Sequence, residues 1–271
     1  MAGYWPAPRE VTTGMTDQPV GAASGVQSLN RAFELLERLA DADGTLGLSD
    51  LAAATGLPLP TVHRLLRSLA AGGYVRQEPS RRYTLGARLI RLGDAASRSI
   101  GVWAGPQLRR LAVEVGETAN MAMLEGDAAV YVAQAPSAHS MRMFTEVGRR
   151  VMAHCTGVGK VLLSRLDDSA VLRVVRRTGL PAMTDNTITA PERLLAELAG
   201  VRQQGYAVDD GEQEVGVRCL AVPVEGGPGS IAISVSGPSS RLTEERIPQI
   251  VPVLHRVAVD LGAELRESVA G

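Results

Sequence analysis

The stretch from residue 57 to residue 74, LPLPTVHRLLRSLAAGGY, constrains the fold of this chain more than any other part of it. Apolar side chains recur there at the spacing of one helix face, which predicts a helix anchored by Val62, Leu65, Leu66 and Leu69. The side chains left on its other faces are Thr61, His63, Arg64, Arg67 and Ser68. Such a face can enter the major groove of DNA, and it is equally typical of an amphipathic helix with a solvated basic side.

The residues before this helix favour the first interpretation. The segment LSDLAAAT predicts a short helix with Ser49 as its N-cap and Asp50 in the first turn, where the helix dipole stabilises a carboxylate. Gly56 supplies a C-terminal stop, and Pro58 and Pro60 fall in the first turn of the next helix, where a missing N–H costs little. A short helix, a turn that contains glycine and an amphipathic helix together indicate a helix-turn-helix.

A β-hairpin is expected directly after the helix. YVRQ and RYTL are strand-like runs, and the tetrapeptide EPSR between them forms turns readily. A hairpin in this place is the wing of a winged helix. Residues 58–93 hold seven arginines and one glutamate, so their charge is +6 in a chain of net charge −1. This asymmetry favours double-stranded DNA as the partner. Aromatic residues make up only 3%, which disfavours a surface that stacks single-stranded bases.

The overall composition is that of a soluble globular protein, with 45% hydrophobic and 21% charged residues among 271. This length allows two modest domains or one large one. Cys155 and Cys219 lie far apart, and no Cys/His cluster has metal-ligand spacing. We therefore expect no disulfide framework, no metal and no cofactor, and reduced thiols fit the cytoplasm. No apolar run reaches the roughly 18 residues that a membrane-spanning helix needs.

The remaining segments of the N-terminal half are simpler. Residues 1–25 have no apolar period and are predicted to be a disordered tail. Residues 85–99 and 102–115 are predicted helices, the first of them a linker. Residues 26–42 predict a helix whose inward face carries Leu29, Ala32, Phe33, Leu36 and Leu39.

The C-terminal half mixes strands and helices, which predicts an α+β domain. Its segment HCTGVGKVLLSRL reads as a turn that runs into a helix. In the closing helix, Ile250, Val253, Leu254, Val257 and Leu261 are expected to face inward. The predicted elements are strands at 118–126, 128–135 and 140–147, helices at 168–178 and 191–204, strands at 205–210, 218–225 and 230–237, and a helix at 242–267.

Several blocks of this sequence resemble one family. GVQSLNRAFELLERLAD, LSDLAAATGLPLPTVHRLLRSLAAGGYV and RRYTLGARLIRLG are similar to the DNA-binding half of IclR-type transcriptional regulators, and HCTGVGK, GYAVDDGEQEVGVRCLAVPV and AISVSGPSSRLT to their effector-binding half. The resemblance implies homodimers, usually paired into tetramers, that bind operator DNA. It also implies that the predicted tail at 1–25 is followed by a winged helix-turn-helix at 26–88, linker helices at 89–116 and a GAF-like α/β effector-binding domain at 117–271.

The DNA-reading helix departs from the family pattern in one place. Many members carry Lys and Ser where this chain has Leu59 and Pro60, so two polar candidates for phosphate contact are missing. The reading face therefore starts late. The residues predicted to contact DNA are Thr61, His63, Arg64, Arg67 and Ser68 in the helix, with Arg81 and Arg82 in the wing for the backbone or the minor groove.

An anion pocket is predicted at the turn before the helix of HCTGVGKVLLSRL, because N–H groups at a helix N-terminus favour a carboxylate or phosphate. The residues around it do not fit a nucleotide-binding P-loop. By resemblance, a small organic acid would contact the main chain of Gly157 and Val158 and the side chains of Asp209, Cys219, Ser234 and Ser236. Ser234 and Ser236 share one face of a strand and can both donate to a carboxylate, whereas Asp209 can accept. Apolar walls are expected from Met141, Met143 and Leu220.

Plainer interpretations remain open for these residues. The glycines at 157 and 159 can exist only for a tight turn, Cys219 can be a small buried hydrophobe, and serines on alternate strand positions are often surface residues. His154 and Cys155 are adjacent, and on an extended strand they would point to opposite faces, which disfavours a nucleophile paired with a base. Lys160, the only lysine, is expected to be structural.

We predict that the chain is a ligand-responsive DNA-binding regulator, not an enzyme: a repressor of a catabolic operon that a small organic acid or ureide releases. The segments HCTGVGK and DDGEQEVGVRC are most similar to those of regulators of allantoin and glyoxylate use, and glycerol-operon regulators are also close. This similarity suggests glyoxylate or allantoate as the effector. One alternative is an activator of the same family that responds to a glycerol derivative or an aromatic acid. Another is an enzyme acting on a small carboxylate, which lacks a credible acid–base pair in the C-terminal half.

Overall fold

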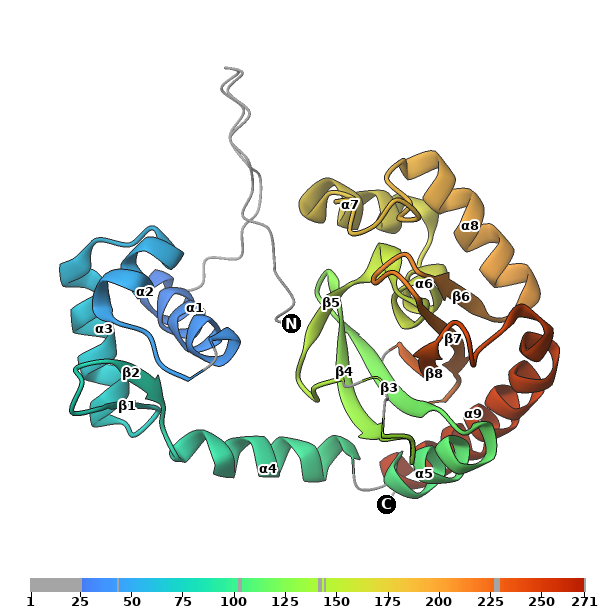
Figure 1. Ribbon diagram of the computed structural model, residues 1–271, viewed down its shortest axis with the longest axis horizontal. Helices are drawn as coiled ribbons and strands as arrows, with labels where there is room; N and C mark the ends of the chain where they lie inside the picture. The colour runs from blue at the N-terminus through green and yellow to red at the C-terminus, as the bar shows by residue number, and fades with distance from the viewer. Residues whose placement is uncertain are drawn as a thin grey trace. The chain divides into compact units, whose positions relative to one another are not determined.

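The computed structural model describes residues 26–42, 44–101, 104–140, 143, 145–226 and 230–270, with backbone alone at 97–101 and 267–270. The chain divides into two compact units after Gly93. One is a small helical unit with a hairpin, and the other is built on a larger sheet (Figure 1). The predicted tail at 1–25 lies outside the described residues.

The N-terminal unit is the predicted winged helix-turn-helix. An additional backbone bridge pairs Leu46 with Tyr83, so the loop before the second helix runs alongside the wing. The elements are α1 (Gln27–Asp41), α2 (Leu48–Thr55), α3 (Leu59–Ala71), β1 (Val75–Gln77) and β2 (Tyr83–Leu85). The buried core draws on all of them: Leu35, Leu39, Leu51, Val62, Leu65, Leu66, Val75 and Tyr83.

The turn between α2 and α3 forms for the reasons expected from the sequence, but the start of α2 differs. Gly56 ends α2 with φ +65°, a left-handed conformation that glycine adopts without strain, and Pro58 is the N-cap of α3. Ser49 lies inside α2 and does not cap it. The N-cap is Gly47, whose N–H donates to Asp50 Oδ2 at 2.9 Å. The aspartate side chain, which lies in the first turn, thus provides an acceptor for the N–H of the N-cap residue.

Helix α1 buries only part of the predicted face: Leu39 lies in the core, and Ala32 and Leu36 pack against it. Leu35 and Leu39 are buried, whereas Leu29 and Phe33 are 54% and 58% exposed. The helix carries more apolar residues than the short helices α2 and α3 can cover, so only one part of its apolar stripe enters the core of this unit. Helix α4 (Arg88–Gly101) follows the wing and begins three residues later than predicted, because Leu85 belongs to β2.

The C-terminal unit contains a sheet of order β5-β4-β3-β8-β7-β6, in which all neighbouring strands are antiparallel. Strands β3 and β8 come from opposite ends of this unit and pair at the centre of the sheet (Figure 1). The strands are β3 (Thr118–Glu125), β4 (Ala128–Ala135), β5 (Arg150–Met152), β6 (Ala207–Asp210), β7 (Val217–Val224) and β8 (Ile231–Pro238).

One predicted strand is wrong. The described residues within 140–147 are in no strand, and the edge strand β5 lies later in the chain. A turn precedes β5, in which the N–H of Arg149 donates to the carbonyl of Glu146 and Gly148 has φ +92°. The alternating residues at 140–147 match a strand pattern, but the turn shifts the pairing to β5.

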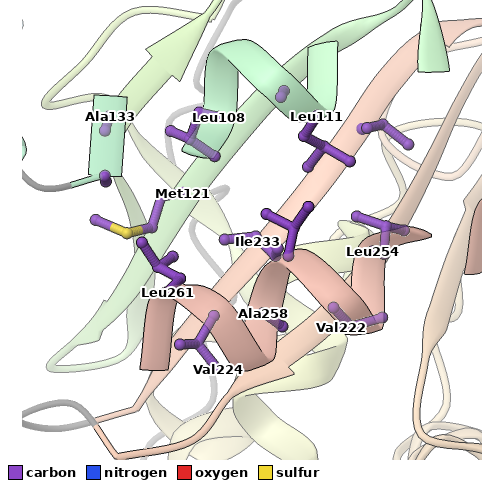
Figure 2. Packing of buried hydrophobic residues seen from close by; sticks show 14 of the residues in the cluster. Leu108, Leu111, Met121, Ala133, Val222, Val224, Ile233, Leu254, Ala258 and Leu261 are labelled. Carbon is purple, nitrogen blue, oxygen red and sulfur yellow. The ribbon is translucent and has the colours of Figure 1, made fainter. Parts of the chain in front are cut away.

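One face of the sheet is covered by α5 (Ala104–Val115) and α9 (Ile247–Ala270) (Figure 2). Leu108 and Leu111 of α5 and Leu254 and Leu261 of α9 pack against alternate residues of the central strands, and all four are completely buried. Helix α9 starts later than predicted, after a 3-10 turn at Glu244–Arg246. Burial of this apolar surface is the main favourable contribution to the stability of the unit.

The other face is covered by α6 (Gly157–Ser164), which follows a 3-10 turn at Ala153–Cys155. Helices α7 (Asp168–Thr178) and α8 (Pro191–Gln204) pack outside α6 and have the predicted bounds. Small residues on the sheet, among them Ala122, Ala221 and Ala232, let α6 approach closely. Within the part of the chain that the structure describes, no helix has both the length and the apolar character to cross a membrane.

Candidate functional site

Helix α3 presents the face predicted to read DNA. Val62, Leu65 and Leu66 are buried, whereas His63, Arg64, Arg67 and Ser68 are exposed and Thr61 is half-buried. The hydroxyl of Ser68 donates to the carbonyl of Arg64 at 3.2 Å. Its hydrogen is therefore used within the helix, which leaves the two arginines and the imidazole as the stronger candidates for base contacts.

The two wing arginines predicted to contact DNA lie in different surroundings. Arg81 is exposed in the turn of the hairpin with φ +62°. Arg82 donates from Nε to Thr45 Oγ1 at 2.9 Å and from a terminal nitrogen to the Thr45 carbonyl at 2.7 Å. It also lies 3.5 Å from Asp50. Arg82 thus braces the wing against the start of α2, whereas Arg81 projects from the tip.

Two further arginines belong to this surface. Arg76 on β1 has a 69% exposed side chain and a distant ion pair with Glu78 at 3.5 Å. Arg88 donates to the Gly72 carbonyl at 2.9 Å and lies 4.9 Å from the centre of the Tyr74 ring. Its guanidinium therefore provides a charged donor to a carbonyl at the C-terminal end of α3, and it also forms a cation–π contact with Tyr74. The sequence pattern gives their charge but not these roles.

In the C-terminal unit, the strand register gathers polar side chains on the sheet face toward α6. Cys219 pairs with Asp209 on one side and with Ser236 on the other, and Ser234 pairs with Asn120. Residues two apart on a strand share a face, and the alanines two positions further along pack on α6. We call this set the polar patch: Thr118, Asn120, Gln134, Asp209, Cys219, Ser234 and Ser236.

The polar patch is partly hydrogen-bonded internally. Gln134 donates to Asn120 Oδ1 at 3.2 Å, and the Asn120 amide donates to Ser236 Oγ at 3.5 Å. Ser234 is completely buried, and its hydroxyl has no hydrogen-bond partner. A buried hydroxyl without a partner costs free energy in the unbound protein, so a ligand that accepts its hydrogen would gain from it.

The N-terminus of α6 lies directly over the patch. Thr156 caps it by accepting the N–H of Gly159 at 3.2 Å. A Cβ added to Gly157 would lie 3.0 Å from the Cys219 sulfur, so glycine permits this close approach of helix to strand. The side chain of Val158 is buried in the core beneath α6, which leaves only its main chain for a ligand.

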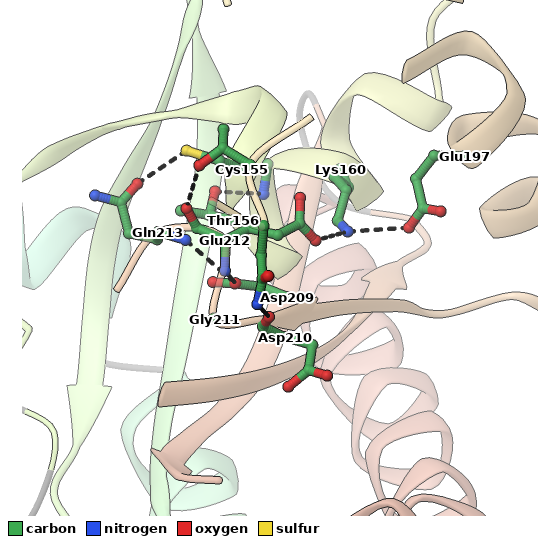
Figure 3. Close-up of polar contacts among 12 residues, drawn as sticks. Cys155, Thr156, Lys160, Glu197, Asp209, Asp210, Gly211, Glu212 and Gln213 are labelled. Carbon is green, nitrogen blue, oxygen red and sulfur yellow. Dashed lines mark hydrogen bonds and ion pairs between the residues drawn. The ribbon is translucent and has the colours of Figure 1, made fainter. Parts of the chain in front are cut away.

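Asp209 closes the patch at the β6 edge of the sheet (Figure 3). Its Oδ1 accepts the N–H of Glu212 at 2.8 Å and that of Gln213 at 3.4 Å. Burial raises the pKa of Asp209 to about 7, and the nearby Glu212 adds to this effect, while the two N–H donors and Lys160 oppose it. The carboxyl group therefore titrates near neutral pH.

Lys160 is fully buried in the first half of α6, as a structural role requires. Its Nζ lies 2.9 Å from Glu197 Oε1 of α8 and 2.5 Å from Glu212 Oε1 of the loop after β6 (Figure 3). The carbonyl of Glu212 also accepts the hydroxyls of Thr184 and Thr187 from the α7–α8 loop. This buried ion cluster holds three segments of the unit around one ammonium group.

The His154–Cys155 pair is not arranged as a base and a nucleophile. Both residues lie in a 3-10 turn and not on an extended strand. His154 Nε2 lies 3.1 Å from the Pro181 carbonyl, whereas the Cys155 thiol donates to Gln213 Oε1 at 3.0 Å. Burial raises the pKa of Cys155 to about 12 and that of Cys219 to about 11, so both thiols are protonated at neutral pH.

Three apolar residues were predicted to line the site, and the structure places them differently. Leu220 is one residue from Cys219 on β7, so it points to the opposite face and is buried in the core against α5 and α9. Its side chain does not line the patch. Met143 is half-buried, and its carbonyl accepts the Thr118 hydroxyl at 3.1 Å. Met141 lies outside the described residues.

Asn120 and Gln134 were not predicted from the sequence. Asn120 is completely buried in the strand TANMAMLE, whose other buried residues are Thr, Ala and Met. A lone amide in such a strand is a usable signal, because a buried polar group needs a partner. Within the part of the chain that the structure describes, no three His, Cys, Asp or Glu side chains are grouped so as to hold a metal ion.

Comparison with known proteins places both units in one family. Residues 28–79 match the IclR helix-turn-helix domain, and residues 95–263 match the C-terminal domain of bacterial IclR transcriptional regulators. The transcriptional repressor IclR of Escherichia coli K12 is 36% identical, with 89% of this chain and 90% of that protein covered. The transcriptional repressor AllR of Escherichia coli K12 is 35% identical, with 92% and 93% covered.

Solved structures agree. The crystal structure of an IclR transcriptional regulator from Alicyclobacillus acidocaldarius has a TM-score of 0.77 and 30% identity, and the match covers 89% of this chain and 99% of that one. Both halves of the chain, in the same order, thus match one kind of protein across almost its full length. This chain belongs to the IclR family of transcriptional regulators.

Proposed function

We propose that this protein is a ligand-responsive repressor that binds duplex operator DNA with α3 and the wing and binds a small carboxylate or ureide at the polar patch. The observation that carries the proposal is the exposed face of α3, on which His63, Arg64 and Arg67 project from a helix whose opposite face is fully anchored. We assign residues 26–88 to DNA binding, 89–116 to the linker and 117–271 to effector binding.

The DNA-bound form that we propose is a homodimer, with pairs of dimers forming a tetramer in the cytoplasm. Two α3 helices of a dimer would enter successive major grooves, about 34 Å apart. Arg64 and Arg67 are suited to guanine because a guanidinium donates to O6 and N7 together. Arg76 and Arg81 are suited to phosphates, which fix the position of the protein without reading sequence.

The effector that we propose is glyoxylate or a ureide acid such as allantoate. The free hydroxyl of Ser234 and the N–H groups at the start of α6 are donors suited to a carboxylate, and Asp209 can bond to a carbonyl, hydrate or ureide group. The relatives IclR and AllR are repressors by name. The protonated thiols and the hydrogen-bonded His154 give no activated nucleophile, which supports a binding role over an enzymatic one.

Fluorescence anisotropy on the promoter region beside the protein's own gene tests DNA binding. We expect specific binding that weakens steeply with salt. Arg64→Ala should weaken it by about 1–3 kcal/mol and relax specificity at one base pair. Arg173→Ala, an exposed arginine on α7, is the matched control and should bind as wild type does. Binding without any preference for that promoter over unrelated DNA would refute the assignment.

A thermal-shift titration with glyoxylate, pyruvate and allantoate tests the effector site. A ligand at a hundredfold excess over its Kd stabilises the folded protein by about 2.7 kcal/mol. Ser234→Ala should abolish this shift. Ser164→Ala, a buried serine at the other end of α6 whose hydroxyl donates to the Val161 carbonyl, should keep it. An unchanged shift in Ser234→Ala would exclude the polar patch as the site.

A further inference from the structure

The charges around the polar patch do not balance. Asp209 and Glu212 are buried, at 3% and 7% exposure, and Glu197 is about one-third exposed. The cation among them is Lys160, which is committed to both glutamates at 2.9 and 2.5 Å. Among the described residues, Asp209 forms no ion pair. Within the described part of the chain, two N–H donors hold its carboxyl group, and both bond to Oδ1.

The other titratable groups that face Asp209 are neutral at physiological pH. Cys219 is its direct partner across β7, Cys155 lies on the turn before α6, and Tyr131 reaches toward it from β4. Burial raises the pKa of all three, so none carries a charge near pH 7. A carboxylate placed on the patch would therefore meet hydroxyls and N–H groups, while the further cation near these groups is the exposed Arg149, which acts on Tyr131.

We propose that the polar patch binds a small monocarboxylate together with one proton. Asp209 takes this proton up from solvent, keeps it, and uses it to donate a hydrogen bond to the ligand. This inference rests on the proposed function of the patch as the effector site. Two carboxylates that share a site of low polarity cannot both stay ionised without a large cost, so one of them takes a proton. The ligand's own carboxyl is the stronger acid, because an α-keto acid ionises well below the pH at which Asp209 does.

The position of the proton follows from the contacts. Both N–H donors bond to Oδ1, so the proton resides on Oδ2 and can be donated to a ligand oxygen. Since the pKa of Asp209 is about 7, roughly half of the molecules already carry this proton at neutral pH. Binding then completes the protonation, with a net uptake of one proton from solvent by molecules in which Asp209 was ionised.

The same balance discriminates between ligand classes. A monoanion leaves the patch with one added negative charge, which Ser234, Ser236 and the N–H groups of α6 can solvate. A dianion of similar size adds a second charge, for which no buried and uncommitted cation is present among the described groups. Glyoxylate and oxalate are two-carbon acids of similar size that differ by one charge, so we expect the patch to accept glyoxylate and to reject oxalate.

Calorimetric titration of the full chain tests this with glyoxylate, pyruvate, allantoate and oxalate. Measurements at pH 6, 7 and 8 in buffers of different ionisation enthalpy give both the affinity and the number of protons taken up. If the ligand binds only the protonated form, its affinity is about tenfold lower at pH 8 than at pH 6, and uptake approaches one proton at pH 8. Little uptake is expected at pH 6, where Asp209 is already protonated.

Two variants separate the carboxyl group from its neighbourhood. Asp209→Asn keeps an oxygen for the two N–H donors and cannot titrate, so its affinity should not change with pH and its binding should take up no proton. Asp210→Asn is the matched control, because Asp210 is the next residue, is exposed and pairs with Arg218 at 2.7 Å. This control should retain the wild-type pH dependence and proton uptake.

The outcomes distinguish this inference from the proposed function. Binding of a monocarboxylate without proton uptake in wild type, or with unchanged uptake in Asp209→Asn, overturns the inference and leaves the effector site intact. Oxalate that binds as tightly as glyoxylate overturns the discrimination by charge. If none of the three monocarboxylates binds at any pH, the proposed effector class and the inference fail together.

Discussion

The face of α3 and the polar patch are the two surfaces proposed to bind ligands, and they handle charge in opposite ways. On α3, Arg64 and Arg67 are exposed and hydrated, so an unbound cation costs little there. In the patch, Asp209 and Ser234 are buried, and each lacks part of what would stabilise it. The first surface suits a large, highly charged partner, and the second suits one small molecule.

This difference also separates local from non-local construction. The reading face is complete within thirteen consecutive residues of one helix. The patch needs five strands from both ends of the unit, a loop and the start of α6. Its charge balance is therefore a property of the folded unit and is more vulnerable to a single substitution. The predictions that follow test this vulnerability in decreasing order of effect.

Removal of the buried cation should have the largest effect. Lys160→Met leaves Glu197 and Glu212 facing each other without compensation, and the loss of one partner from a buried ion pair costs about 3–5 kcal/mol. Urea denaturation at pH 7 measures this loss. A second substitution, Glu212→Gln, should restore part of the stability because it removes one of the two stranded charges.

The exposed pair of Arg177 with Asp127 is the control for this experiment. It is short, at 2.5 Å between Arg177 and Asp127 Oδ1, but lies at the surface. Arg177→Met should shift the midpoint of denaturation only slightly, because exposed ion pairs are screened by water. A loss in Lys160→Met no larger than that in Arg177→Met would show that the buried cluster does not stabilise the unit.

Asp209 should give the second largest effect, and its sign is fixed by the direction of its pKa. The native pKa is about 7, and the value in the unfolded chain is about 3.9. The native state therefore binds the proton more tightly between these values, and stability falls as the pH rises through this window. Asp209→Asn removes the penalty. Relative to wild type, it should gain up to about 4 kcal/mol between pH 4 and pH 8.

Chemical denaturation of both proteins at several pH values measures this gain. Asp210→Asn should follow wild type across the range. A gain that stops growing by pH 5 would place the pKa of Asp209 near that of an ordinary aspartate, and the buried carboxyl would then be ionised whenever the effector binds.

The parts of the fold that the sequence predicted are those set by neighbouring residues. Helices α7 and α8 have the predicted bounds, and Gly56 and Pro58 produce the turn of the helix-turn-helix. Helical and strand periods act over a few residues, so they can be read directly. The inward face of α1 was predicted correctly at Leu39, but Leu29 and Phe33 are exposed, because packing decides how much of an apolar stripe is covered.

The candidate site shows the same division more sharply. The resemblance supplied Asp209, Cys219, Ser234 and Ser236, which the register places on one face of the sheet. Asn120 was missed because β3 becomes a neighbour of β8 only through the strand order. The proposed role of Leu220 ignored the alternation of β7, which turns it into the opposite core. Neither the exposure of apolar residues on α1 nor the identity of the effector can be predicted from neighbouring residues in the sequence.

The smallest predicted effects separate two adjacent arginines of the wing. Arg81 projects from the turn, so Arg81→Ala should reduce the slope of log K against log salt by about one and leave stability unchanged. Arg82 is bonded to Thr45 and lies beside Asp50, so Arg82→Ala should cost about 1 kcal/mol of stability with little change in the slope. Anisotropy titrations and urea denaturation of both variants measure these quantities.

The reverse pattern would change the picture of the wing. If Arg82→Ala lowers the salt slope and leaves stability intact, its guanidinium must leave Thr45 and reach a phosphate when DNA binds. The brace between the wing and α2 would then exist only in the free protein. Thr45→Val decides between the two: it removes the hydroxyl that accepts from Arg82 Nε but cannot touch the charge. A brace predicts that Thr45→Val weakens the unit by part of the loss in Arg82→Ala, because the bond to the Thr45 carbonyl remains. A phosphate contact predicts that it leaves both DNA affinity and stability near wild type.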